Sequence, residues 1–452
     1  MDERFLIDRA LDVLRSGGAD GDVFVERRRS LALRVREGRL DEISRAEACG
    51  LAIRAMREGR LGFAHTSALD VDGIARSAAK ALELAGSASP REDLALADPT
   101  GPGDGRDEGE GLNLYDSSIE RRGVSEKQEW VRSVEAIARG VDAKIRRTDG
   151  ASYHENLAGY WIANTKGLFR HYQKSHLEVG VQVVAEDQGQ MQTGELGTEA
   201  IRWEELPEPG ELGRRAGERA LRLLGGRPVA TGRYPVVFSP EAGYALLVYL
   251  ALALRGDHLS RGRSWLSGRA DAMLASPQVT IRDDGRHVRG PASVPFDAEG
   301  IDTRGTLLLE GGKVCGSLRD LASGKRLGLP STGNAHREGY ERLPEIAATN
   351  LYLVPGPKKV EQVLAPVGKG LWAWGLTGWR TGLDPSNPRL SCGAFGLWLE
   401  GGKPTQPVAR VTISGSFQEI LGGIEEIADD LVWDHPTKTP TFRVSALSVS
   451  GV

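Results

Sequence analysis

The chain has 452 residues, of which 40% are apolar and 27% charged, a composition typical of soluble folded proteins with two to four domains. Its formal net charge of −4 excludes a strong overall attraction to nucleic acid or to anionic membranes. The three cysteines, Cys49, Cys315 and Cys392, are too few and too scattered for a disulfide framework or a cysteine-rich zinc module. Glycine is the outlier, because 58 residues, about 13% of the chain against a usual share of about 7%, predict many tight turns.

The first residues and the apolar runs show no targeting signal and no membrane span. The segment from Met1 to Arg4 is charged, which is untypical of a signal peptide. The longest apolar run, residues 242–254, is shorter than the roughly 20 residues that cross a bilayer. We therefore expect a cytoplasmic protein with neither a membrane nor a nucleic acid as its partner.

The first 85 residues predict two hairpins between two helices. Apolar residues at helical spacing predict a helix from about residue 5 to the glycine pair 17–18, and a second one over residues 71–84 with Asp70 as its cap. The pairs Glu37-Gly38 and Glu58-Gly59 are expected to form the hairpin turns. The predicted strands are 23–25, 31–35, 40–43, 51–56 and 61–63.

Residues 88–112 form an acidic segment rich in proline and glycine. Because this segment lacks apolar anchors, we expect a poorly ordered loop. The elements expected after it are, in order, a helix over 125–138 with Ser125 as N-cap, a strand over 144–154, a turn at 156–159, strands over 160–163 and 168–184, and a helix over 211–224.

A glycine- and proline-containing stretch at residues 225–233 marks the expected boundary between a domain of residues 1–226 and a domain of residues 227–452. In the second domain, Ser239-Pro240-Glu241 begins a helix that is apolar on all faces and is therefore expected to be buried. Short β-stretches separated by glycines follow it. We predict an α+β fold, with an N-terminal α/β domain of antiparallel hairpins and flanking helices, and a C-terminal, mostly antiparallel barrel- or sandwich-like β domain with one buried helix.

The histidines form no conventional catalytic or metal motif. His154-Glu155 begins like the His-Glu-x-x-His motif of zinc helices, but Ala158 and Gly159 occupy the positions where the second histidine is needed. His171 and His176 lie five residues apart, which places them on opposite faces of a strand. The sequence also contains neither a Gly-x-Ser-x-Gly elbow nor a Walker motif, so it does not support a serine hydrolase or a P-loop nucleotide site.

Two tryptophans lie two residues apart on a predicted strand. Trp372 and Trp374 would share one face of the sheet. The pair would line a groove for a peptide or another ligand, or it would pack on the inner face of the sheet. Both interpretations are open at this point.

Ten sequence blocks occur in a characteristic order. They are Leu51–Ser67, Ile162–Gly167, Gly256-Asp257, Arg261–Ser264, Pro295–Gly300, Leu321–Gly328, Ser331–Ala335, Thr349–Gly356, Pro440–Val444 and Val449–Gly451. On these blocks the chain resembles, over nearly its whole length, the TldD/PmbA (TldD/TldE) family, whose members were once called modulators of DNA gyrase. Chains of the TldD branch resemble zinc peptidases. In these, the two histidines of His-Glu-x-x-x-His on a buried helix and a cysteine near the C-terminus would hold the metal, and the glutamate would take a proton from the attacking water.

The zinc motif of the TldD branch has no counterpart in this sequence. Gap-free alignment from Gly256-Asp257 gives, at the positions of His, Glu and His, either Leu247, Val248 and Leu252 or, one residue later, Val248, Tyr249 and Ala253. The last cysteine, Cys392, lies far upstream of the C-terminal ligand position. The chain therefore resembles the PmbA/TldE branch, in which the zinc site is absent and the protein pairs with a TldD-type subunit.

The resemblance implies a metal-free subunit of a TldD/TldE-type metallopeptidase heterodimer that acts on unfolded or leader peptides. This chain would hold no catalytic residue, no metal and no cofactor, and zinc would be bound by the TldD-type partner. The alternatives are a stand-alone peptide-binding or scaffold homodimer, and an autonomous hydrolase that uses His258 or Cys392. Candidate peptide-channel or structural residues are Asp257, Arg261, Arg263, Asp297, Glu299, Asn334, Asn350, Trp372 and Trp374.

Overall fold

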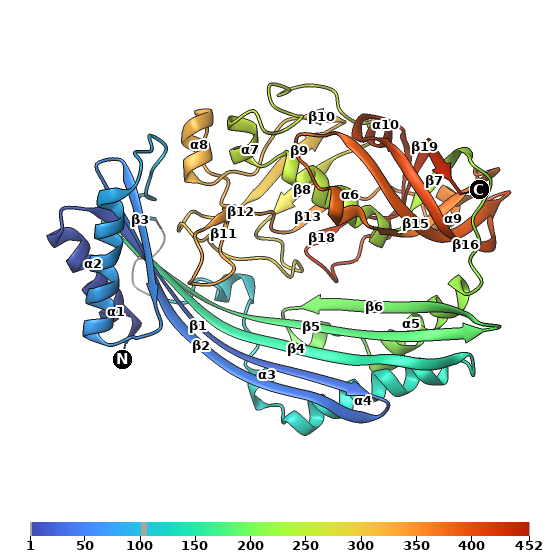
Figure 1. Cartoon of the computed structure of the whole chain (residues 1–452), viewed down its shortest axis with the longest axis horizontal. Helices are drawn as coiled ribbons and strands as arrows, with labels where there is room; N and C mark the ends of the chain where they lie inside the picture. The colour runs from blue at the N-terminus through green and yellow to red at the C-terminus, as the bar shows by residue number, and fades with distance from the viewer. Residues whose placement is uncertain (1, 101–105, 452) are drawn as a thin grey trace.

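A curved six-stranded sheet, in the order β3-β2-β1-β4-β5-β6, organises the N-terminal half of the computed structural model, which describes residues 2–100 and 106–451 (Figure 1). All neighbouring strands in it are antiparallel. The predicted turns at Glu37-Gly38 and Glu58-Gly59 are confirmed, and both residues of each pair have positive φ, as tight hairpin turns require. The strands are β1 (Asp20–Arg36), β2 (Arg39–Arg57), β3 (Arg60–Thr66), β4 (Ile145–Asn164), β5 (Phe169–Asp187) and β6 (Gln190–Ala200).

The expected turn at residues 156–159 is wrong, because β4 is one continuous strand of 20 residues. Residues 156–159 pair with β1 on one side and with β5 on the other. Two complete ladders outweigh the local turn preference of asparagine and glycine, and Gly159 gives room to the ring of Trp161, which would collide with a Cβ there. The reversal falls instead before β5, where Gly167 has a φ of 100° that other residues rarely adopt.

Helices cover one face of this sheet. They are α1 (Glu3–Ser16), α2 (Val71–Ser87), α4 (Val124–Gly140) and α5 (Pro209–Leu223), with the short α3 (Ser118–Arg121) and the 3₁₀ turns η1 (Glu110–Leu112) and η2 (Trp203–Glu205) beside them. The predicted cap is confirmed at Asp70, which accepts a hydrogen bond from the Gly73 N–H at 2.6 Å. It is wrong at Ser125, because the helix begins one residue earlier and has Gly123 at its N-cap. Alternate apolar residues of the strands pack against these helices.

The acidic segment 88–112 has anchors that its composition does not suggest. Leu96 and Ala97 are buried, and the Asn164 side chain donates a hydrogen bond to the Ala97 carbonyl at 2.8 Å. Glu108 forms an ion pair with the buried Arg170. Residues 101–105 of the expected loop lie outside the described residues.

The C-terminal half contains a closed five-stranded barrel. Strands β16, β15, β14, β7 and β19 follow one another, and a further pairing of β16 with β19 closes the ring. All of these pairs are antiparallel except β7 with β14. The strands are β7 (Gly232–Phe238), β14 (Lys369–Thr377), β15 (Arg389–Glu400), β16 (Lys403–Ser416) and β19 (Phe442–Ser450), and β17 (Ile424–Ile427) extends the sheet at β19.

The helix α6 (Pro240–Ala253) lies between the barrel and a second sheet, β10-β9-β8-β13-β18. It contacts β7 and β14 of the barrel as well as β13 and β18 of the second sheet, which explains why it is apolar all around. The predicted cap is confirmed, because the Ser239 hydroxyl accepts a hydrogen bond from the Ala242 N–H. The remaining elements are β8 (Ile281–Asp284), β9 (Gly305–Glu310), β10 (Lys313–Val314), β13 (Leu351–Leu353), β18 (Thr437–Lys438), the pair β11 (Ala335–His336) and β12 (Glu345–Ile346), α7 (Gly256–Ser260), α8 (Leu321–Leu327), α9 (Val360–Leu364), α10 (Phe417–Gly422) and η3 (Trp379–Gly382).

The architecture confirms the predicted α+β fold with antiparallel sheets and a β-rich C-terminal half. The C-terminal half faces the sheet surface that the helices leave open (Figure 1). No helix in the described ranges 2–100 and 106–451 is long and apolar enough to cross a membrane.

Arg54 of β2 joins the two halves across this interface. Its Nη1 donates to Glu299 Oε1 at 2.9 Å, and its Nε donates to Asp22 of β1 at 2.9 Å. All three side chains are buried. Burial alone would lower the pKa of Arg54, but the charges of Asp22 and Glu299 raise it above its ordinary value. The guanidinium therefore stays charged and holds two carboxylates that would otherwise be buried without a partner.

We predict that Arg54→Met destabilises the protein by about 3–5 kcal/mol, because it leaves Asp22 and Glu299 buried and unpaired. Urea unfolding followed by circular dichroism would measure the loss. Arg15→Met is the matched control, since the ion pair of Arg15 with Asp12 is exposed and should contribute little. Equal stability of the two variants would contradict this role for Arg54.

Candidate functional site

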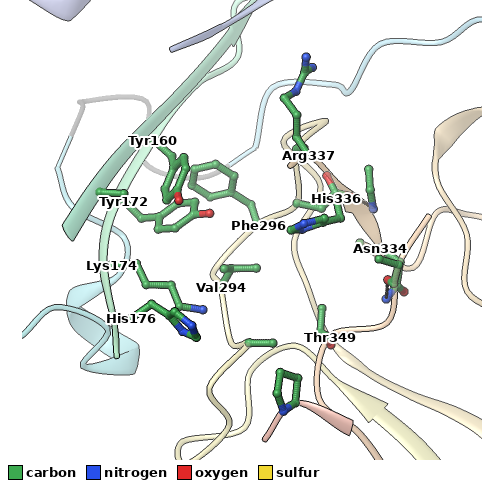
Figure 2. Close-up of a pocket in the computed structure, with 18 of the residues that line it drawn as sticks. Tyr160, Tyr172, Lys174, His176, Val294, Phe296, Asn334, His336, Arg337 and Thr349 are labelled. Atoms are coloured by element: carbon green, nitrogen blue, oxygen red, sulfur yellow. Dashed lines mark hydrogen bonds between the residues drawn. The ribbon is translucent and has the colours of Figure 1, made fainter. Parts of the chain in front are cut away.

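A cavity of about 400 Å³ lies between the open face of the N-terminal sheet and loops of the C-terminal half. Strands β1, β4 and β5 supply one wall, and residues 292–298, 333–337 and 347–349 supply the other. The volume is within the range of small-molecule and cofactor sites in proteins. Figure 2 shows side chains from both halves pointing into the same space.

One end of the cavity is aromatic. Tyr160 of β4 and Tyr172 of β5 are neighbours with ring centroids 5.0 Å apart, and Phe296 of the opposite wall meets Tyr172 edge to face at 5.0 Å. Figure 2 shows these three rings gathered on one side of the space. Rings arranged in this way offer an apolar surface together with two phenolic hydroxyl groups.

The other end of the cavity carries nitrogen donors. Lys174 and His176 of β5 point into it from one wall, and His336 of β11 points into it from the other (Figure 2). Lys174 Nζ donates to the Ser293 carbonyl at 3.0 Å, and burial lowers its pKa to about 8. Burial and the Lys174 charge lower the pKa of His176 to about 4 and also lower that of His336. At pH 7 both imidazoles are therefore neutral, and Lys174 supplies the positive charge.

A carboxylate on β6 lies next to this cavity, between two imidazoles. Glu199 Oε1 is 3.1 Å from His435 Nε2, and its Oε2 is 3.7 Å from His176 Nε2. Burial, together with the nearby charge of Glu178, raises the pKa of Glu199 to about 7. The backbone N–H of Glu199 also donates to the Asp434 carbonyl at 2.8 Å, so β6 is tied to the C-terminal half at this point.

Two of the predicted site residues, Asp297 and Asn334, lie in the wall of the cavity. The carboxylate of Asp297 accepts hydrogen bonds from the backbone N–H groups of Glu299, Ile301 and Ala335 at 2.9–3.0 Å. Burial and the Glu299 charge raise its pKa to about 7. The amide of Asn334 donates to Asp283 Oδ2 at 2.7 Å. Both side chains hold loops of the wall in place.

The other predicted polar residues lie away from the cavity. Glu299 bonds Arg54 and the Leu321 N–H, and Asn350 bonds the Asp284 carbonyl and Ser293 Oγ. Asp257 pairs with Arg255 at 3.0 Å. Arg261 and Arg263 are exposed, and within the described part of the chain neither side chain forms a hydrogen bond or an ion pair.

The two tryptophans share a face of β14, and their rings meet edge to face at 5.5 Å. Trp372 packs against an apolar cluster around Val363 and Leu399. Neither indole lines the cavity between the two halves. The contacts of Trp372 favour the packing interpretation over a ligand groove.

The residues at the positions of the TldD-branch zinc motif do not fit a metal. Leu247 is buried in the core, and the Tyr249 hydroxyl lies 2.6 Å from both the Asp384 and the Asn387 carbonyl oxygens, to one of which it donates. Cys392 is buried in the same core, and burial raises the pKa of its thiol to about 11. Among the residues that the structure describes, no three His, Cys, Asp or Glu side chains come together as metal ligands.

Sequence reasoning missed the residues that β5 brings into the cavity. Tyr172, Lys174 and His176 lie on one face of the strand, and His171 lies on the other, stacked on Trp161 at 4.5 Å. The opposite placement of His171 and His176 is thus confirmed. The sequence signal that could have revealed these residues is an alternation along β5. Polar residues occupy the even positions and the apolar Leu177 and Val179 occupy odd ones, which indicates a strand with one polar face over a cavity.

We predict that raising the pH from 5 to 8 destabilises the wild type relative to Glu199→Gln by about 2 kcal/mol of unfolding free energy. The folded-state pKa of Glu199, about 7, lies above the ordinary value of 4.5. The contribution of Glu199 to the free energy of unfolding of the wild type is therefore lost as the pH rises toward and through 7. The variant does not lose it, because glutamine does not titrate. Urea unfolding at both pH values measures the gap. The exposed Glu204→Gln is the control, and a constant gap for Glu199→Gln would refute the assignment.

Family models of the PmbA/TldA metallopeptidase match domain 1 at residues 21–85, the central domain at 118–224 and the C-terminal domain at 231–451. A metalloprotease of Methanothermobacter thermautotrophicus is 28% identical to this chain, and the match covers 89% of this chain and 86% of the relative. The metalloprotease PmbA of Escherichia coli O157:H7 is 26% identical, and the match covers 95% of this chain and 92% of the relative. A solved putative modulator of DNA gyrase from Thermotoga maritima superposes with a TM-score of 0.89 at 25% identity, over 99% of this chain and all of that one. TldE from Thermococcus kodakarensis shares the fold, with a TM-score of 0.85 at 20% identity, over 99% of this chain and all of that one. The chain belongs to the PmbA/TldD metallopeptidase family.

Proposed function

We propose that this chain is a metal-free, PmbA/TldE-like subunit of a peptide-degrading assembly, in which a TldD-type partner supplies the zinc and the hydrolytic chemistry. The observation that carries the proposal is the replacement of the family's zinc ligands on α6 by side chains of the core. In one alignment frame Leu247 stands in place of an imidazole ligand, and in the other Tyr249 stands in place of the glutamate that would take a proton from water; both pack in the core. An isolated copy would then lack the group that activates water.

The cavity supports a role in holding peptide rather than cleaving it. Tyr160, Tyr172 and Phe296 offer apolar contacts, and Lys174, His176 and His336 offer hydrogen-bond donors. Among the described residues of its wall, the carboxylate is that of Asp297. It already accepts hydrogen bonds from three backbone N–H groups and is not oriented as a general base. We expect unfolded or leader peptides as substrates of the assembly, and we expect the assembly to act in the cytoplasm.

The test is coexpression of this chain with a TldD-type chain from the same genome. We predict that the two chains copurify, that an unfolded test peptide is cleaved only when both are present, and that zinc accompanies the TldD-type chain. Size-exclusion chromatography, mass spectrometry of the peptide and elemental analysis measure the three outcomes. The isolated chain is the matched control.

Two results would replace this proposal. A stable homodimer that binds peptides and ignores the TldD-type chain would favour the stand-alone scaffold. About one zinc per isolated chain, lost in Cys392→Ala or His258→Ala, would favour an autonomous hydrolase.

A further inference from the structure

The cavity between the two halves contains the positive charge of Lys174, on which the nearby carboxylate of Glu199 acts only from a distance, without a direct ion pair. The ammonium of Lys174 has three donor hydrogens, and one of them bonds the Ser293 carbonyl. No carboxylate oxygen in the described ranges lies within 4 Å of this ammonium. Two donor positions of Lys174 are therefore left to face the cavity.

The carboxylate in the cavity wall does not balance this charge. Both oxygens of Asp297 are turned toward the loop backbone, where they accept three N–H groups. Burial and the neighbouring Glu299 also raise its pKa to about 7, so Asp297 is only partly ionised near neutral pH. The guanidinium of Arg28, which also lines the cavity, differs from Lys174 in being paired, because it lies 3.6 Å from the carboxylate of Glu26.

Two imidazoles face the same space as the Lys174 ammonium. A neutral imidazole offers one N–H donor, and His176 and His336 point inward from opposite walls (Figure 2). The nearest ionic partner of His176 is Glu199, at 3.7 Å, which is too far for a hydrogen bond. The cavity thus presents an ammonium and two imidazoles that converge on one region.

An apolar surface adjoins these nitrogens. Tyr172 stands next to Lys174 on the same face of β5, and Phe296 and Val294 lie across the space from it (Figure 2). Arg337 also lines the cavity, and its guanidinium lies over the ring of Phe24 at 4.7 Å. A ligand that fits both ends must carry a negative group and an aromatic or branched apolar group a few bonds apart.

We propose that this cavity binds a carboxylate attached to an aromatic or branched apolar group, with the carboxylate on Lys174 and the apolar group against Tyr172 and Phe296. A carboxylate accepts several hydrogen bonds at once and forms its strongest ones with charged donors. Two sources have this chemistry, namely the free C-terminal residue of a peptide and a small free acid. The peptide source rests on the proposed function, whereas the carboxylate site itself does not.

The experiment is isothermal titration calorimetry on the purified full chain at pH 7. The probes are N-acetyl-L-phenylalanine, its amide, and the peptide Ala-Ala-Ala-Phe with a free acid or an amide at its C-terminus. We predict that every acid probe for which binding is detected binds at least ten times more tightly than the corresponding amide. Lys174→Met should remove this preference, and Lys174→Arg should keep part of it.

Lys144→Met is the matched control, because Lys144 is an exposed lysine of the same half that pairs with Asp187. A preference restricted to the peptide acid would assign the site to peptide C-termini, and a preference shown by both acids would assign it to the shared carboxylate group. Equal binding of acid and amide by the wild type, or no binding of any probe at millimolar concentration, would overturn the proposal. The wild-type comparison holds even if a variant misfolds, and no TldD-type chain is present, so failure here is separate from failure of the proposed function.

Discussion

The structure depends on how the open face of the N-terminal sheet is covered. Helices bury the other face through apolar contacts, but this face carries Asp22, Arg54 and Arg170, which cannot be covered by apolar residues alone. The C-terminal half supplies Glu299 to Arg54 and Asp302 to Arg170. The Arg54–Glu299 pair is buried, whereas Arg170 is buried and its partner Asp302 is exposed. These charge-assisted contacts fix the position of one half on the other, and the cavity is the part of the interface where the two surfaces do not meet.

Local signals predicted much of the fold. Hairpin turns at Glu37-Gly38 and Glu58-Gly59, and the cap at Ser239, depend on only a few neighbouring residues, and they were correct. The turn expected at residues 156–159 failed because two flanking strands impose an extended conformation there. Barrel closure is beyond local reasoning as well, since it depends on Thr412 meeting Ser450 across the intervening chain.

The candidate site was predicted less well than the fold. The family blocks led to Asp297 and Asn334, which do lie at the cavity, but their polar atoms bond the backbone and Asp283 and so shape the wall. The residues that face the cavity from β5, such as Lys174, belong to no block. Their proximity to His336 depends on the packing of two halves that are far apart in sequence, and a spacing rule within one strand cannot supply that information.

The two-sided character of β5 limits how this protein can change its length during evolution. One face of the strand holds Lys174 and His176 in the cavity, and the other holds Leu177 and Val179 in the core. A single inserted or deleted residue after Lys174 would exchange the two faces, exposing apolar side chains and burying ionisable ones. Descendants of this sequence can therefore accept insertions at the turns on either side of β5, whereas within it only pairs of residues preserve the pattern.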